Sequence, residues 1–166
     1  MSVRVRAAAP GDAEAIAAIH NQGVADRVAT LRTEPREADD VLAAIAAARP
    51  LLVAEFADGK VKGWASVGPY DDRSQWYSGV GEATVYIARE ARGSGIGRLL
   101  LAALEASAYQ TGYFKLIAKV FDTNAASLRL FGGAEWDEVG THRRHGLLDG
   151  EWKDVVVFEK FLPGTT

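Results

Sequence analysis

The segment from residue 82 to residue 104 constrains the fold of this chain more than any other part of the sequence. Residues 82–88 predict a strand, and apolar residues at helical spacing predict a long helix after it. Between them lies a turn with three glycines, which reads Arg92-Gly93-Ser94-Gly95-Ile96-Gly97. Glycines let a backbone approach a ligand closely, and the start of a helix presents free amides and a positive dipole end. This turn therefore suits a phosphate or pyrophosphate, with charge added by Arg92 and Arg98.

Two other phosphate-binding motifs do not match this turn. A Walker loop needs Gly-Lys followed by Ser or Thr, whereas Arg98 and Leu99 follow the last glycine. A dinucleotide fingerprint needs G-x-G-x-x-G in an early strand-helix-strand unit, whereas the spacing here is G-x-G-x-G after several hairpins. A turn whose glycines serve packing alone stays open as an alternative.

The remaining segments predict a mixed, mainly antiparallel sheet with about four helices, which is an α/β (α+β) architecture. Asp58-Gly59 and Asp149-Gly150 each separate two apolar runs, as in hairpins. The first helix is expected to start with Asp12 as its N-cap, and the second to follow Pro35. The seven expected strands are residues 3–6, 51–56, 61–67, 82–88, 116–120, 136–145 and 152–161. The long helix is expected to bury Ile96, Leu99, Leu100, Ala103 and Leu104.

Length and composition exclude several classes of protein. With 166 residues, the chain is expected to form a single domain over 1–166. It has no cysteine and three histidines without metal-ligand spacing, so no metal is expected. A net charge of −3 argues against a nucleic-acid partner. No apolar stretch approaches the roughly 20 residues of a membrane span, and no signal segment is present, so a cytoplasmic location is expected.

The glycine-rich turn resembles the acetyl-CoA motif of the GNAT N-acetyltransferase superfamily, which it matches at Arg92, Gly95 and Gly97. A second motif, Asn124 to Ser127, is similar to the Asn-x-x-Ser segment that opens the next GNAT helix. The resemblance narrows to the phosphinothricin and arsinothricin N-acetyltransferase branch. The segments that carry it are residues 27–30, 33–35, 82–87, 143–146 and 149–156. It implies the GNAT fold, acetyl-CoA as co-substrate, a homodimer and a small acceptor amino acid with a phosphinate, arsinate, sulfone or sulfoximine group.

The resemblance also implies a cofactor site made partly of backbone. Val85, Tyr86 and Ile87 would pair with the pantetheine arm as an added strand, and an amide there would polarise the acetyl carbonyl. Helix capping is the alternative role of Asn124 and Ser127. The implied cofactor-binding residues are Val85, Tyr86, Ile87, Arg92, Gly93, Ser94, Gly95, Ile96, Gly97, Arg98, Asn124 and Ser127.

Glu82 matches the family's catalytic glutamate at the start of the predicted strand. Only a neutral amine attacks a thioester, so the reaction needs a base, and a carboxylate can take the proton directly or through one water. The alternative is an exposed glutamate at a strand edge.

The loop of residues 69–81 supplies the expected acceptor site. The Arg73 guanidinium matches an anion with two oxygens, Trp76 and Tyr77 would wall the pocket, and Leu31 would line it from the segment between the first two helices. A solvated Arg73 is the alternative. The phosphinothricin enzymes often carry a basic residue where this chain has Asp71, so the chain departs from that pattern.

Phe131 is a second departure, because members of the family carry a His or Tyr there. Phenylalanine cannot protonate a leaving thiolate, so the thiolate leaves unaided or another hydroxyl serves. His20 is expected to be a core histidine satisfied by one hydrogen bond. The tryptophans Trp64, Trp136 and Trp152 are expected to serve packing.

Three functions stay open from sequence. The first is acetyl transfer to a small acidic amino-acid analogue. The second is acetyl transfer to a polyamine, an antibiotic or a protein N-terminus. The third is an acyl-CoA-binding sensor without catalysis, which the change at Phe131 favours and the presence of Glu82 opposes.

Overall fold

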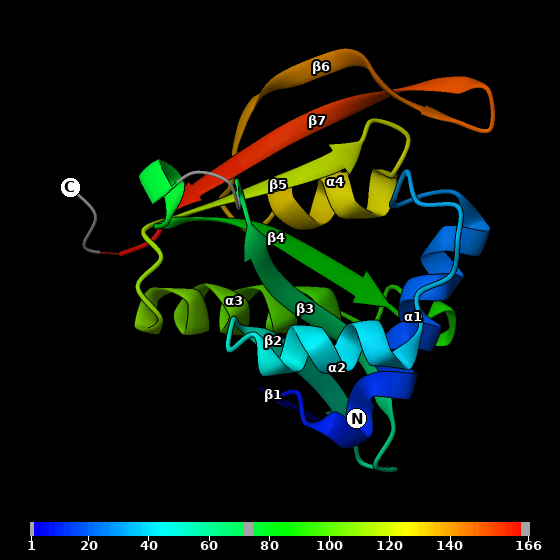
Figure 1. The fold of residues 1–166 in the computed structure, drawn as a ribbon, viewed down its shortest axis with the longest axis vertical. Helices are drawn as coiled ribbons and strands as arrows, with labels where there is room; N and C mark the ends of the chain where they lie inside the picture. Colours follow the sequence, from blue (N-terminus) through cyan, green and yellow to red (C-terminus); the bar gives the residue numbers. More distant parts are fainter. Residues whose placement is uncertain (1, 72–74, 164–166) are drawn as a thin grey trace.

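The computed structural model describes residues 2–71 and 75–163 and contains one seven-stranded sheet with four α-helices (Figure 1). The strand order is β1-β2-β3-β4-β5-β7-β6, with only the β4–β5 pair parallel among the described residues. The strands are β1 (Val3–Ala7), β2 (Leu51–Phe56), β3 (Val61–Pro69), β4 (Val80–Ile87), β5 (Lys115–Phe121), β6 (Asp137–Leu148) and β7 (Glu151–Phe161). The helices are α1 (Ala13–Asp26), α2 (Ala38–Ala46), α3 (Ile96–Gln110) and α4 (Ala125–Gly132). The predicted mixed, mainly antiparallel sheet is confirmed.

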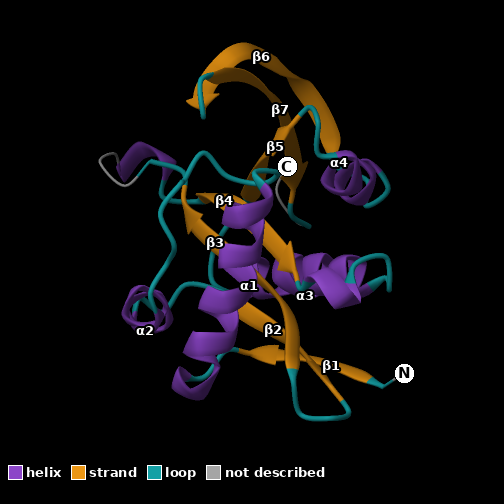
Figure 2. Ribbon diagram, turned by 90° about the vertical axis from the view of Figure 1, so that its right-hand side faces the viewer, coloured by secondary structure: helices purple, strands orange, loops and turns teal. Residues whose placement is uncertain are grey.

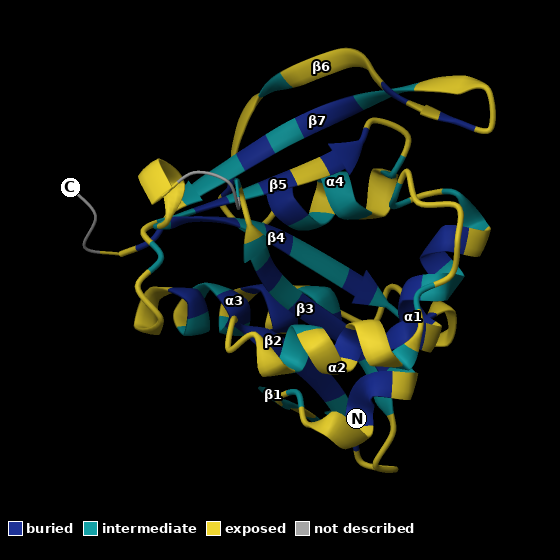
Figure 3. Cartoon of the chain, viewed as in Figure 1, coloured by how far each residue is buried: buried dark blue, intermediate teal, exposed yellow. Residues whose placement is uncertain are grey.

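Helices cover both faces of the sheet. Gly23 on α1 faces Tyr86 on β4, whereas Leu100 on α3 faces Gly63 on β3 from the other side. Figure 2 shows α2 and α3 on opposite sides of the strands. Because both faces are covered, β2 is buried along most of its length and reads as a nearly continuous apolar run. The outer strand β6 is exposed along most of its length (Figure 3).

The centre of the sheet opens where β4 leaves β5. Their parallel pairing joins residues 80–82 to residues 115–117, and beyond it the two strands diverge (Figure 1). On its other side β4 stays paired with β3 as far as Ile87, which lies opposite Gly63. Residues 83–87 therefore keep one backbone edge that β5 does not cover.

Two buried positions were predicted wrongly. Leu99 is 51% exposed, because α3 turns Leu100, Leu101 and Leu104 toward the sheet and leaves Leu99 on its outer side. Trp152 is 58% exposed at the start of β7, in the long hairpin, whereas Trp64 and Trp136 are buried as expected.

Asp12 does not cap α1 with its side chain. Its carboxylate instead accepts a hydrogen bond from the Ala9 amide at 2.8 Å and pairs with Arg6 at 2.7 Å. The Arg6 guanidinium holds the pKa of Asp12 below its ordinary value. The side chain thus stabilises the short 3-10 turn Pro10–Asp12 ahead of α1, and the predicted helix begins at Ala13. No helix among the described residues is long and apolar enough to cross a bilayer.

Candidate active site

Two cavities meet at the uncovered edge of β4. We call the first the turn cavity: it measures about 480 Å³ and is lined by residues 91–98, by residues 123–127 at the start of α4, and by residues 85–87. The second, the sheet cavity, measures about 370 Å³ and lies between β3, β4, β5 and the segment after α1. The residues that line both are Ala29, Val85, Tyr86, Asn124 and Ser127. Because they share this lining, groups bound in the two cavities would come together at Val85 and Tyr86.

The turn cavity has the backbone features that a pyrophosphate requires. Gly93 and Gly95 have φ angles of 76° and 85°, in the left-handed region that side chains disfavour. Helix α3 begins immediately afterwards at Ile96, so the amides of its first turn lie at this cavity. A Cβ atom at Gly97 would lie 3.4 Å from the Leu130 side chain, which is an ordinary van der Waals contact.

The two arginines of the turn are anchored to other parts of the chain. Arg92 pairs with Asp26 at 3.0 Å, and Arg98 donates to the Gly133 carbonyl at 2.6 Å. Hydrogen bonds from Arg89 and Arg92 lower the pKa of Asp26, which stays charged beside them. Both Arg92 and Arg98 line the turn cavity, and part of the charge of Arg92 is neutralised by Asp26.

Asn124 caps α4 and also joins it to the segment after α1. Its Oδ1 accepts from the Ser127 amide at 3.1 Å, and its Nδ2 donates to the Val28 carbonyl at 3.1 Å. Capping, the alternative considered from sequence, is therefore present. Both Asn124 and Ser127 nevertheless line both cavities, so capping leaves them at the place where ligands would meet.

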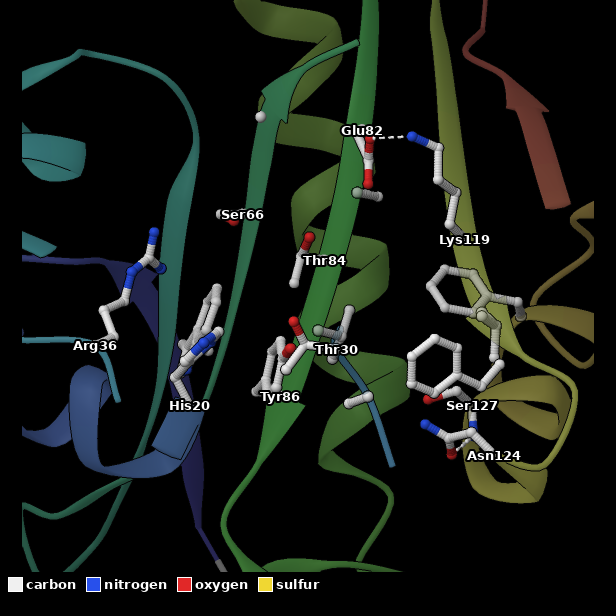
Figure 4. A pocket seen from close by; sticks show the side chains of 18 of the residues that line it. His20, Thr30, Arg36, Ser66, Glu82, Thr84, Tyr86, Lys119, Asn124 and Ser127 are labelled. Carbon is white, nitrogen blue, oxygen red and sulfur yellow. Dashed lines mark hydrogen bonds and ion pairs between the residues drawn. The ribbon is translucent and has the colours of Figure 1, made fainter. Parts of the chain in front are cut away.

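The sheet cavity is lined by polar side chains of alternate strand residues. Glu82, Thr84 and Tyr86 share one face of β4, and Ser66 on β3 lies opposite Thr84 (Figure 4). The Glu82 carboxylate accepts from Lys119 Nζ on β5 at 2.9 Å, across the narrow end of the opening between the strands. A carboxylate that could take a proton therefore lines this cavity beside a lysine.

Tyr86 forms the wall between the cavities. Its ring stacks on Trp64 at 5.0 Å and lies 4.8 Å from the His20 ring. Burial raises the pKa of the Tyr86 phenol to about 12, against the opposing effect of a hydrogen bond with Thr30. Gly23 permits this arrangement, because a Cβ atom there would lie 2.7 Å from the Tyr86 ring.

His20 departs from the expectation of a satisfied core histidine. It is 8% exposed, but neither ring nitrogen has a hydrogen-bond partner. Burial lowers its pKa to about 4, and the charges of Arg36 and Arg32 act in the same direction. The imidazole is therefore neutral near pH 7. Both His20 and Arg36 line the sheet cavity at the end away from Glu82 (Figure 4).

Phe131 is buried and packs edge-on against Trp136 at 4.9 Å. It lines the sheet cavity with hydrocarbon only, at the position where the resemblance implies a His or Tyr. Two residues with hydroxyl groups, Tyr86 and Ser127, line both cavities.

The structure does not bring all predicted acceptor residues together. Arg73 lies outside the described residues. Trp76 and Tyr77 are 83% and 48% exposed and do not line either cavity. Leu31 lies against Gly146 of β6, where a Cβ atom would meet its side chain, and also does not line the cavities.

Sequence reasoning missed several residues of the sheet cavity, chiefly Arg36, Trp64, Ser66, Thr84 and Lys119. Lys119 had a signal, because a lone charge within an otherwise apolar strand needs an explanation. Thr84 also had a signal, because it lies two residues after Glu82 on the same strand and therefore faces the same side of the sheet. Arg36 had none, since it lies in a turn far from β4 in sequence.

The chain matches the model of the acetyltransferase (GNAT) family over residues 19–132. It is 36% identical over 163 residues to phosphinothricin N-acetyltransferase of Alcaligenes faecalis, covering 95% of this chain and 82% of that protein. It is 32% identical over 169 residues to the L-methionine sulfoximine/L-methionine sulfone acetyltransferase of Pseudomonas paraeruginosa, covering 99% and 98%.

Solved structures agree with these relatives. A GNAT superfamily phosphinothricin acetyltransferase from Sinorhizobium meliloti, solved in complex with acetyl-CoA, superposes with a TM-score of 0.91 at 25% identity. The match covers 100% of this chain and 93% of that one. The family match, the relatives and the shared fold lead to one conclusion: this chain belongs to the acetyltransferase (GNAT) family and is an acetyl-CoA-dependent N-acetyltransferase.

Proposed function

We propose that this enzyme transfers acetyl from acetyl-CoA directly to the amine of a small amino-acid analogue of the phosphinothricin, arsinothricin or methionine sulfoximine/sulfone type. The observation that carries this proposal is the meeting of the two cavities at Val85 and Tyr86, with Glu82 lining the sheet cavity. Relatives of this chain are named for phosphinothricin and for methionine sulfoximine and sulfone.

The charges of the sheet cavity favour an acceptor with oxygen-rich groups over a polycation. Its charged lining residues are the cations Arg36 and Lys119 and the acid Glu82, which already pairs with the lysine. A polyamine carries several positive charges and would be repelled by this lining, whereas an acceptor with oxygen-rich groups would be attracted.

The turn cavity fits acetyl-CoA. Residues 93–98 would hold the pyrophosphate at the start of α3, and the uncovered backbone edge of residues 85–87 would pair with the pantetheine arm. Bound acetyl-CoA would supply a thioester whose acetyl carbon accepts the amine nitrogen, while the sulfur leaves with the electrons of the broken C–S bond. An amide of this edge would stabilise the charge that develops on the acetyl oxygen.

Glu82 would act as the general base. An ammonium has no free electron pair, so the carboxylate takes a proton from the amine directly or through one water before attack. Lys119 lies 2.9 Å away and donates a hydrogen bond to this carboxylate.

The proton for the leaving thiolate does not come from Phe131. A thiolate is only modestly basic and can leave unprotonated. The Ser127 and Tyr86 hydroxyls, which line both cavities, are the alternative donors.

We also propose a homodimer, as the family resemblance implies. The hairpin of β6 and β7 carries exposed apolar side chains at Val139, Leu147 and Trp152, which suit an interface between copies. Light scattering coupled to size exclusion tests this point: twice the mass of 17.8 kDa is expected, and a monomer would contradict it.

Acetylation of a toxic amino-acid analogue would make resistance the physiological role.

Release of CoA thiol from acetyl-CoA tests the acceptor class. The panel contains phosphinothricin, arsinothricin, methionine sulfoximine, methionine sulfone and a polyamine. Release with one or more of the acidic analogues is expected. Release with the polyamine alone would favour the second function considered from sequence, and acetyl-CoA binding without release for any acceptor would favour the sensor.

A further inference from the structure

A third cavity adjoins the sheet cavity, and the proposed transfer chemistry does not use it. It lies between α1, α2, the start of β2 and the second half of β3, and we call it the α2 cavity. It measures about 190 Å³, far more than the roughly 10–15 Å³ that one bound water needs. Part of its lining is apolar and comes from Ile16, Val41 and Leu51. The α2 cavity therefore has room for a small organic group.

The α2 cavity and the sheet cavity share part of β3. Ser66 and Gly68 line both cavities, and both residues are half-buried rather than enclosed. Gly68 lies directly opposite Glu82 in the β3–β4 pairing, so the two positions face the same side of the sheet. Figure 4 shows Ser66 between Arg36 and Thr84 on this side. A ligand held at Glu82 thus has the α2 cavity as its neighbour across a single strand.

Gly68 leaves the space between the two cavities open. Among the described residues, a Cβ atom there would have one neighbour within 4 Å, the Glu82 carbonyl oxygen at 3.9 Å. By contrast, a Cβ atom at Gly81 would lie 2.3 Å from the Val67 side chain. The φ angle of Gly68 also lies outside the left-handed region that favours glycine. Neither packing nor backbone conformation requires a glycine at position 68, whereas an open passage does.

Arg49 lies at the far side of this passage. The Pro50 carbonyl accepts from the Val67 amide at 2.9 Å, so Arg49, one residue before Pro50, comes next to Gly68. Neighbouring strands lie about 4.8 Å apart, which places the backbone of Arg49 about 10 Å from that of Glu82 across β3. An amino acid with a side chain of a few bonds fits this separation, with its amine at one residue and its side-chain end at the other.

The charge of the α2 cavity is positive. Among the described residues, its charged lining consists of Arg36 and Arg49. Arg49 is exposed and forms no ion pair within residues 2–71 and 75–163. Arg36 is half-buried with an inaccessible Nε, so it adds charge to the cavity without a contact through that atom. An anionic group in this cavity would be attracted, and a cationic one repelled.

We propose that the α2 cavity receives the side chain of the acceptor, whose oxygen-rich end lies at Arg49 while its amine lies at Glu82. Gly68 keeps the passage between these two ends open. This inference rests on the proposed function and adds to it a site for the acceptor's side chain. It makes Arg49 and Gly68 determinants of specificity and gives them no part in proton transfer.

Steady-state kinetics with phosphinothricin and with methionine sulfone test the role of Arg49. The side-chain end of phosphinothricin is anionic, and that of methionine sulfone is neutral. Arg49→Gln should raise KM for phosphinothricin roughly tenfold, raise KM for methionine sulfone less, and leave acetyl-CoA affinity unchanged. Arg49→Lys keeps the charge and should retain most of the preference. Arg4→Gln, at an exposed position of β1, is the matched control and should behave as the unaltered protein.

Substitution of Gly68 tests the passage. Gly68→Val fills it with three carbon atoms, so KM for both acceptors should rise roughly tenfold to a hundredfold, and Gly68→Ala should have a smaller effect. Acetyl-CoA affinity should not change. Gly132→Ala is the control, because a Cβ atom there would also have open space around it. Thermal denaturation should show that all three variants are folded.

The possible outcomes separate this inference from the proposed function. Unchanged KM values in Gly68→Val, or equal changes for both acceptors in Arg49→Gln, would overturn the α2 cavity and leave the proposed function standing. A loss of the preference in Arg73→Gln but not in Arg49→Gln would assign the side-chain end to the loop of residues 69–81 instead. If the unaltered protein acetylates no acidic analogue, the proposed function fails, and this inference fails with it.

Discussion

The turn cavity and the sheet cavity meet at Val85 and Tyr86, yet they are built from different parts of the chain. The turn cavity is made largely of backbone: two glycines with positive φ, the start of α3 and the free edge of β4. The sheet cavity is made of side chains from α1, the turn before α2, β3, β4 and β5. A site formed by backbone does not change when side chains are substituted, so it can recognise the part that all its ligands share. A site formed by side chains can change its acceptor when those residues are substituted.

The largest effect is expected from the proposed base in the sheet cavity. Glu82→Gln removes the proposed base and keeps the shape of the side chain, so turnover should fall roughly 10²- to 10⁴-fold. The turn cavity is untouched, so acetyl-CoA affinity should be unchanged. Steady-state kinetics and calorimetric titration measure the two quantities. Unchanged turnover across a pH series would remove Glu82 from the mechanism.

A substitution in α1 should displace Tyr86, which lines both cavities. A Cβ atom from Gly23→Ala would lie 2.7 Å from the Tyr86 ring, which must then move. Overpacking of this kind costs about 1–3 kcal/mol of stability and should raise the acceptor KM. Gly11→Ala, with no atom within 4 Å of the new Cβ, is the control. Thermal denaturation of both variants would show the difference, and equal stability would contradict the close contact with Tyr86.

A substitution in the glycine-rich turn should damage the turn cavity alone. Gly95→Ala places a Cβ atom on a residue with φ of 85°, a strain of about 1–2 kcal/mol, so acetyl-CoA affinity should fall roughly tenfold. Gly59→Ala imposes similar strain at φ of 76° in the β2–β3 turn and should leave that affinity unchanged. If both variants bound acetyl-CoA equally, backbone recognition by the turn would be wrong.

The last prediction concerns pH. Burial lowers the pKa of His20 to about 4 from an ordinary 6.5, so protonation favours the unfolded chain. The free energy of unfolding should therefore decline as pH falls from about 6.5 to about 4, and His20→Phe should decline less. The lowered pKa values of Asp12 and Asp26 act below about 3.8, outside this window. Denaturant titrations at several pH values would test this, and identical slopes for both proteins would contradict it.

The contrast between the turn cavity, built from backbone, and the sheet cavity, built from side chains, explains what could be predicted from sequence. The order of elements and the turn cavity follow from local signals: alternation, the Asp-Gly turns, and the glycines between β4 and α3. The sheet cavity brings together Arg36, Trp64 and Lys119, which lie far apart in the chain. No local pattern links such residues, so they had to be seen in three dimensions.

The wrong predictions from sequence also concern burial and contacts, which depend on packing between elements far apart in the chain. Leu99 fits the helical period of α3 but lies at the border of its apolar face, where the orientation of the helix on the sheet decides burial. His20 was correctly placed on the buried face of α1, but its lack of partners depends on β3 and on the turn before α2. Trp76 and Tyr77 lie in an exposed 3-10 turn rather than in the cavity.

The central claim is that the basic side chains of the sheet cavity direct the acetyl group to an oxygen-rich amino-acid analogue. Its most direct test is a competition: the enzyme receives limiting acetyl-CoA with equal concentrations of phosphinothricin and spermidine, and mass spectrometry identifies which amine is acetylated. Such a mixture reports the ratio of the two kcat/KM values. We predict that N-acetylphosphinothricin predominates, and acetylspermidine as the main product would contradict the account.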